Sequence, residues 1–71
     1  MTYLEAKETI EDLRVAAVMD KETLLVRAEE LRAEYAKDPW EGTAAQINRL
    51  ENRAVVRGLH AEALAIALTK F

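Results

Sequence analysis

The residue types that most often carry chemistry are scarce in this chain. It contains no Cys and no Ser, so the activated thiol and hydroxyl nucleophiles of common hydrolases cannot be built. His60 is the only histidine, and its helical neighbours Val56, Arg57, Ala63 and Leu64 are not metal ligands. Both glycines are isolated, which excludes a glycine-rich phosphate loop. We therefore expect a non-enzymatic protein with no catalytic residue, no metal site and no cofactor.

One polar constellation remains, a row of mainly basic residues that we call the basic ribbon. Its members are Gln46, Arg49, Arg53, Arg57 and His60. Such a row could dock an acidic protein surface or phosphates. The preceding half of the chain is acidic, however, and pairing of the ribbon with those acids inside the fold is the favoured interpretation. With a net charge of −3 and no basic excess, the sequence does not favour nucleic-acid binding.

Two helices must position these residues, and each has a start signal. Thr2 and Glu5 form a capping-box pattern, which predicts that the first helix begins at about Tyr3. Asp38 followed by Pro39 is typical of an N-cap and a first helical position, so the second helix should run from about Pro39 to about residue 69.

Apolar residues of the first arm, residues 2–37, recur at three- and four-residue spacings. The stripe consists of Tyr3, Ala6, Ile10, Leu13, Ala17, Leu24, Ala28, Leu31 and Tyr35. Its constant phase predicts one continuous helix. A competing pattern, in which Asp20 is an N-cap and Met19 and Leu24 form a hydrophobic staple, would break the helix near Asp20.

The second arm, residues 39–69, carries two apolar stripes. The first aligns Trp40, Ile47, Leu50, Ala54, Gly58, Ala61, Ala65 and Leu68, and the second consists of Val55, Val56, Leu59, Ala63 and Ile66. Since the arms are similar in length and joined by a tight turn, we expect an all-α antiparallel helical hairpin. One neighbour cannot cover two stripes, so we expect two hairpins to form a four-helix bundle. The predicted dimer interface is Val55, Leu59, Ala63, Ile66 and Phe71. A monomeric three-helix bundle, broken at Asp20, is the alternative.

The turn also predicts which residues of the two arms face each other. Opposite positions should have numbers that add up to about 77, which pairs Asp20 with Arg57 and Arg27 with Glu51. Both Asp20 and Arg27 interrupt the apolar stripe, so these pairs would fix the register if they are buried. Otherwise they lie at the rim and contribute little.

Apolar residues off the main stripe of the first arm are the best candidates for contact with another protein. Val15, Val18, Met19, Leu25 and Val26 form a patch bordered by charges, although packing within the dimer would also explain them. Trp40 either covers the turn locally or acts as a hot spot. The predicted partner-binding residues are Val15, Val18, Met19, Val26, Trp40, Arg49 and Arg53.

Length and composition restrict the class of protein. The 71 residues allow one domain, residues 1–71, with a small core that favours oligomerisation. Absence of Cys makes the cytoplasm the expected location. The charged N-terminus does not resemble a signal peptide, and no apolar run is long enough for a membrane span.

In size and arrangement the chain resembles small helical inhibitors encoded by phages, including anti-activators that bind a bacterial transcription regulator. This resemblance is carried by the length, the acidic first arm, the Asp38-Pro39-Trp40-Glu41 turn and the lack of a catalytic motif. It implies a homodimeric regulator or inhibitor that blocks a host protein. The chain also resembles plasmid-type helical hairpin dimers that bind RNA. A structural or chaperone-like module that pairs with a different helical protein is the main alternative function.

Overall fold

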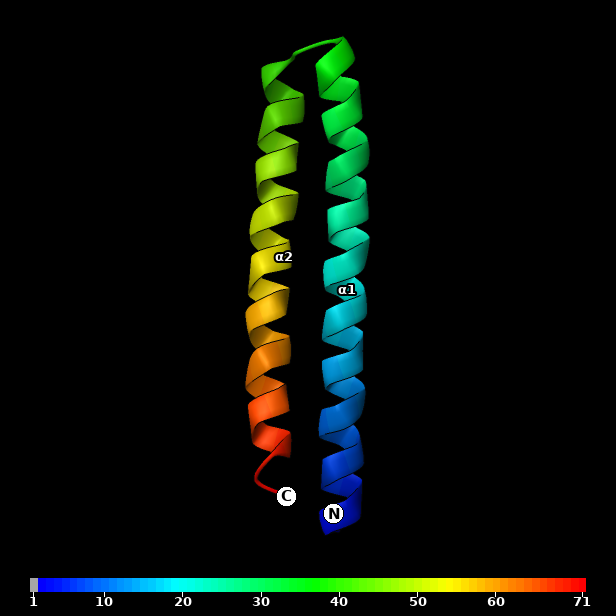
Figure 1. The fold of residues 1–71 in the computed structure, drawn as a ribbon, viewed down its shortest axis with the longest axis vertical. Coiled ribbons are helices and arrows are strands. Elements are labelled where there is room, and N and C mark those ends of the chain that lie inside the picture. The colour runs from blue at the N-terminus through cyan, green and yellow to red at the C-terminus, as the bar shows by residue number, and fades with distance from the viewer. Residues whose placement is uncertain (1) are drawn as a thin grey trace.

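The fold is an antiparallel hairpin of two long helices, seen in a computed structural model that describes residues 2–71 (Figure 1). Helix α1 spans Tyr3–Lys37 and helix α2 spans Glu41–Leu68. The molecule measures 53 × 16 × 13 Å, and both chain termini lie at the end opposite the turn (Figure 1). The predicted all-α hairpin is therefore confirmed.

Helix α1 begins at the predicted capping box. The Thr2 hydroxyl accepts a hydrogen bond from the Glu5 N–H at 3.2 Å, and the Glu5 carboxylate accepts one from the Thr2 N–H at 3.4 Å. These two bonds satisfy groups that a helix start would otherwise leave unpaired. The helix then runs without interruption through Asp20, which confirms the continuous first helix and rules out the three-helix alternative.

The predicted start of α2 is wrong by two residues. Asp38 caps the end of α1, where its N–H donates to the Glu34 carbonyl, and it lies outside the helical region, as expected for a residue before proline. Trp40 is the N-cap of α2 and has extended backbone angles, and no side chain caps this helix. The first helical residue is therefore Glu41, whose carboxylate complements the positive end of the helix dipole.

The core between the helices is thin and consists largely of alanine. The buried residues are Ala17, Ala28, Leu31, Ile47, Ala54 and Ala61, all of which belong to the stripe of the first arm or to the first stripe of the second arm. Small side chains allow two helix backbones to approach closely, but they bury little apolar area. Ala54 and Ala61 of the first α2 stripe lie in this core, whereas Ala65 of the same stripe is exposed.

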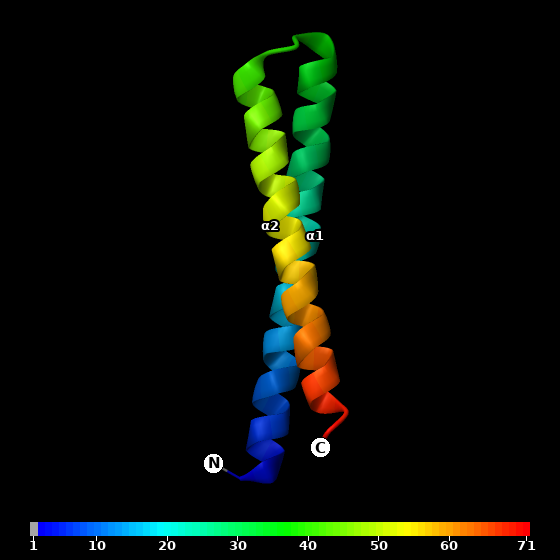
Figure 2. The ribbon, with the colours of Figure 1, turned by 90° about the vertical axis from the view of Figure 1, so that its left-hand side faces the viewer.

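The ends of both stripes remain accessible. Figure 2 shows the two helices crossing near their middle and diverging toward both ends. Tyr3 and Tyr35 are accordingly exposed at the two ends of α1, and Trp40 is exposed beside the turn. The alignment of Trp40 with the first stripe of the second arm is wrong, because this residue precedes α2.

Candidate functional site

The predicted dimer interface is an exposed apolar stripe along α2. Val55, Leu59 and Ile66 are each about 60% exposed, and Ala63 beside them is exposed as well. Phe71 lies apart from this stripe, since its ring packs edge-to-face against Tyr3 of the same chain, with centroids 5.0 Å apart. Burial of a large apolar side chain stabilises a protein by roughly 1.5–3 kcal/mol. A single hairpin does not bury this stripe, so it lacks that stabilisation.

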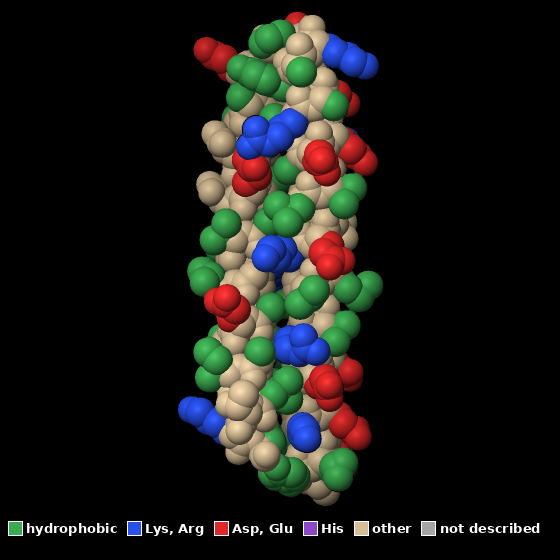
Figure 3. Space-filling model, viewed as in Figure 1, with side chains coloured by type: hydrophobic (Ala, Val, Ile, Leu, Met, Phe, Trp, Pro, Cys, Tyr) green, Lys and Arg blue, Asp and Glu red, His purple; other side chains and the backbone are tan. Residues whose placement is uncertain are grey.

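The α2 stripe borders a groove on one side of the helix seam, which we call the acidic groove. Val18, predicted as a partner contact, is half-buried and lines this groove together with Leu25, Val55 and Leu59. Its charged lining residues are Lys21, Glu22, Glu51 and Glu62. In Figure 3, hydrophobic and charged side chains alternate along the whole length of one face, and no large uninterrupted apolar area appears on it.

Gly58 permits a close contact at the bottom of the acidic groove. A Cβ atom built at this position would lie 3.3 Å from the Lys21 Nζ and 3.4 Å from its Cδ. The outer part of the Lys21 side chain, including its Nζ, therefore lies directly over the α2 backbone at Gly58. The sequence placed Gly58 in the first stripe of the second arm but did not identify Lys21 as its neighbour.

The predicted partner patch on α1 is also accessible. Met19 is 61% exposed, Val26 is 57% exposed and Val15 is 44% exposed. Met19 and Val26 line a shallow hollow together with Glu22 and Thr23. These side chains do not contribute to the hairpin core, which leaves their apolar surface available for contact with another molecule.

Trp40 lies at the tip of the hairpin and is 65% exposed. A Cβ atom at Gly42 would collide with its ring, so the indole lies directly against the backbone of the first turn of α2. The indole ring therefore covers the turn locally, as one of the two interpretations of Trp40 predicted. The outer face of the ring remains free for a contact, as expected for the hot-spot alternative.

Among residues 2–71, the predicted internal pairing of the basic ribbon occurs at one position only. The Arg57 Nε lies 4.0 Å from the Asp20 Oδ2, which confirms the expected register. Arg49 and Arg53 are exposed, and no carboxylate among residues 2–71 lies within 4.0 Å of either guanidinium. Most of the ribbon is therefore an open basic surface and not an internal network.

The predicted pair between Arg27 and Glu51 is wrong. Arg27 Nη1 binds Glu30 Oε2 of its own helix at 3.1 Å, and Glu51 accepts two 2.7 Å hydrogen bonds from Arg32 Nη2. The hydrogen bonding that Arg32 donates to Glu51, followed by the negative charge of Glu51, raises the pKa of the Arg32 guanidinium. Asp20 and Arg27 lie at the rim with exposed side chains, so they do not act as buried register-fixing groups.

We expect a small but measurable coupling between Asp20 and Arg57. In a double-mutant cycle with Asp20→Asn and Arg57→Gln, the coupling energy should be about 0.2–1 kcal/mol, because both side chains are exposed to solvent. Unfolding in urea at low and high salt would measure it, and salt should reduce it. A parallel cycle on Arg32 and Glu51 should give the larger value, because that contact is shorter. If the effects of the two substitutions on the free energy of unfolding are additive, Asp20 and Arg57 do not interact.

Other kinds of site receive no support within the described part of the chain. Among residues 2–71, no helix is sufficiently long and apolar to cross a bilayer, and no cluster of three or more His, Asp or Glu side chains is arranged to hold a metal ion. The cytoplasmic location remains a prediction. Comparison of the chain with protein-family models, with curated proteins and with solved structures gives no match.

Proposed function

We propose that this protein is a non-enzymatic regulator or inhibitor that acts as a helical homodimer and binds another protein. One observation carries the proposal: apolar side chains stay exposed on two separate parts of the hairpin, the α2 stripe around Leu59 and the α1 patch around Met19. A second copy would cover the first surface. A different protein, such as a transcription regulator of the host, would bind the second.

The total surface of the hairpin supports association. A compact monomer of 8.0 kDa exposes about 4,500 Å². This chain exposes 5465 Å², an excess of roughly 1,000 Å², and a standard protein interface buries about 800 Å² on each partner. The elongated hairpin thus offers enough surface for one interface of ordinary size. Because its alanine-rich core buries little apolar area, such an interface would add stability.

The α1 patch fits the contact with a different protein. Val15, Met19 and Val26 are apolar side chains set among charges such as Glu22. Apolar groups supply affinity at an interface, while the surrounding charges orient the partner and exclude unsuitable ones. A structural or chaperone-like module would use the same surfaces, but it would pair with another helical protein in place of a second copy.

Substitution of Val26 by Asp tests this function. We expect affinity capture from the native host, followed by mass spectrometry, to recover a specific partner with the wild-type protein and to lose it with Val26→Asp. Helicity, melting temperature and homodimer mass should stay nearly unchanged, because Val26 is exposed and outside the core.

Leu4→Asp is the matched control, since Leu4 is 60% exposed on the same helix and lies about 30 Å from Val26. This variant should retain the partner. Equal capture by wild type and Val26→Asp would exclude the α1 patch as the contact surface. Recovery of the protein as a stable complex with a different helical chain, and never as a homodimer, would favour the structural module.

A further inference from the structure

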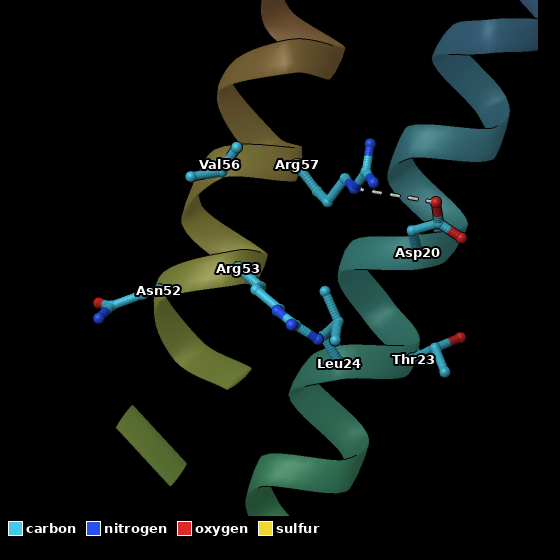
Figure 4. A pocket seen from close by; sticks show the side chains of 7 residues that line it. All are labelled: Asp20, Thr23, Leu24, Asn52, Arg53, Val56 and Arg57. Carbon is cyan, nitrogen blue, oxygen red and sulfur yellow. Dashed lines mark ion pairs between the residues drawn. The ribbon is translucent and has the colours of Figure 1, made fainter. Parts of the chain in front are cut away.

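A second groove runs along the other side of the helix seam, and we call it the basic groove. It consists of two adjoining hollows that share Arg53. Leu24 of α1 and Val56 of α2 provide apolar surface in the first hollow, and Figure 4 shows Arg53 reaching across it toward Leu24. Arg49 lines the second hollow, nearer the turn.

The charge of this groove is opposite to that of the whole chain. Its charged lining residues are four arginines and one aspartate, namely Arg27, Arg49, Arg53, Arg57 and Asp20. The chain as a whole has a net charge of −3, and the acidic groove is lined by three glutamates and one lysine. The residues that line the two grooves therefore differ in net charge, although Glu51 of the acidic groove is paired with Arg32.

Three of the arginines form a regular row. Arg49, Arg53 and Arg57 are spaced four residues apart on α2, so they lie on one side of the helix and span about 12 Å. Only Arg57 has a carboxylate nearby, that of Asp20 at 4.0 Å (Figure 4). The first two guanidinium groups thus retain their capacity to bind carboxylates of another molecule.

We propose that the basic groove binds an acidic amphipathic helix of another protein. This inference rests on the proposed protein-binding function and specifies the chemistry of the partner. A helix lying along the groove would place apolar side chains on Leu24 and Val56 and Asp or Glu side chains, four residues apart, opposite Arg49 and Arg53. Exposed Val56 gives the groove an apolar contact that phosphate binding would not use, and Asp20 would repel phosphates.

The basic groove is compatible with the other two surfaces. Val55 and Leu59 line the acidic groove, whereas Arg49, Arg53 and Arg57 do not, so a dimer formed through Val55, Leu59 and Ile66 leaves the row of arginines open. Thr23 lines both the basic groove and the hollow that holds Met19 and Val26. One partner can therefore contact the groove and the α1 patch together.

Fluorescence anisotropy with a synthetic helix tests the proposal. The probe is a labelled 18-residue peptide with Leu at helical spacing on one face and Glu on both flanks, and its control replaces every Glu by Gln. We expect saturable binding of the Glu peptide by the wild-type protein, weaker binding at high salt and no saturable binding of the Gln peptide. The Arg49→Glu/Arg53→Glu double variant should bind the Glu peptide at least about tenfold more weakly.

A charge-matched variant separates groove binding from general attraction. Lys7→Glu/Lys70→Glu makes the same change in net charge at the open end of the hairpin, and it should bind the Glu peptide within about twofold of wild type. Equal weakening by both double variants, or no saturable binding by wild type, would overturn the proposal. Tighter binding of a labelled single-stranded RNA that depends on Arg49 and Arg53 would overturn it in favour of nucleic acid.

The same variants distinguish failure of this inference from failure of the proposed function. If the Arg49→Glu/Arg53→Glu protein still captures the host partner while Val26→Asp does not, the groove is not the contact surface and the protein-binding function stands. If wild type captures no partner although it binds the acidic peptide, the groove chemistry stands and the regulator function fails.

Discussion

Simultaneous replacement of Leu59 and Ile66 by Glu should convert the proposed homodimer into a monomer, or unfold the chain. Both side chains are about 60% exposed in the single hairpin, so neither change disturbs the core directly. In the dimer they would become buried, where loss of a large apolar side chain costs roughly 2–5 kcal/mol. Light scattering at micromolar concentration should show one chain in place of two, and circular dichroism will show whether the hairpin remains helical without its partner.

Leu4→Glu is the control for this experiment. Leu4 is as exposed as Leu59 and Ile66, but it lies on α1 and outside the second stripe. The control should keep the mass of the dimer. A wild-type monomer at micromolar concentration would refute dimerisation, and an intact dimer of the Leu59→Glu/Ile66→Glu protein would exclude this stripe as its interface.

Enlargement of Ala54 to Leu should lower the stability of the hairpin. Ala54 is 1% exposed, the least of the buried residues, at a place where two helix backbones meet across small side chains. Insertion of a larger side chain into such a position typically costs about 1–3 kcal/mol. For a domain of this size, that corresponds to a decrease of roughly 4–24 °C in melting temperature, measured at a fixed protein concentration.

Ala45→Leu makes the same chemical change on an exposed side of α2 and should alter stability by less than about 0.5 kcal/mol. A similar melting temperature for both variants would show that the helices are not tightly packed at Ala54. A stabilised Ala54→Leu protein would reveal an unfilled gap in the core.

The sequence predicted the hairpin well because helical periodicity is a strong local signal. The stripe through Ala17, Leu24 and Leu31 keeps its phase past Asp20, and phase outweighed the possible cap at that residue. An exposed Asp costs little inside a long helix, which explains why it does not break α1. The capping box at Thr2 was equally local and was predicted correctly.

The errors occurred where several local solutions compete. Asp38 can cap the end of one helix or the start of the next, and in the structure it is the C-cap of α1. Glu51 can reach more than one arginine, because its side chain and those of the arginines are long and accessible to solvent. Small differences in side-chain direction then decide which ion pair forms. The rule that opposite residue numbers add up to about 77 does not distinguish between neighbouring arginines of α1. The ion pair of Glu51 with Arg32 was therefore missed.

The candidate surfaces were only partly predictable for a different reason. Exposed apolar residues such as Met19 and Val26 could be found by subtraction from the buried stripe. Groove residues such as Leu25 and Val56 lie at the flanks of the seam, and their role depends on the angle at which the helices cross. That angle is a property of the packed pair and not of either helix alone.

The position of the turn also sets an order of assembly. Leu31 and Ile47 are separated by a short stretch of chain around the turn, whereas Tyr3 and Phe71 are separated by almost all of it. Since the entropy lost on loop closure grows with loop length, pairing should begin at the turn and proceed toward the termini like a zipper. Leu59 and Ile66 lie in the half of the hairpin that pairs last. The final folding step and the proposed dimerisation should therefore depend on each other. As a result, refolding should accelerate with protein concentration.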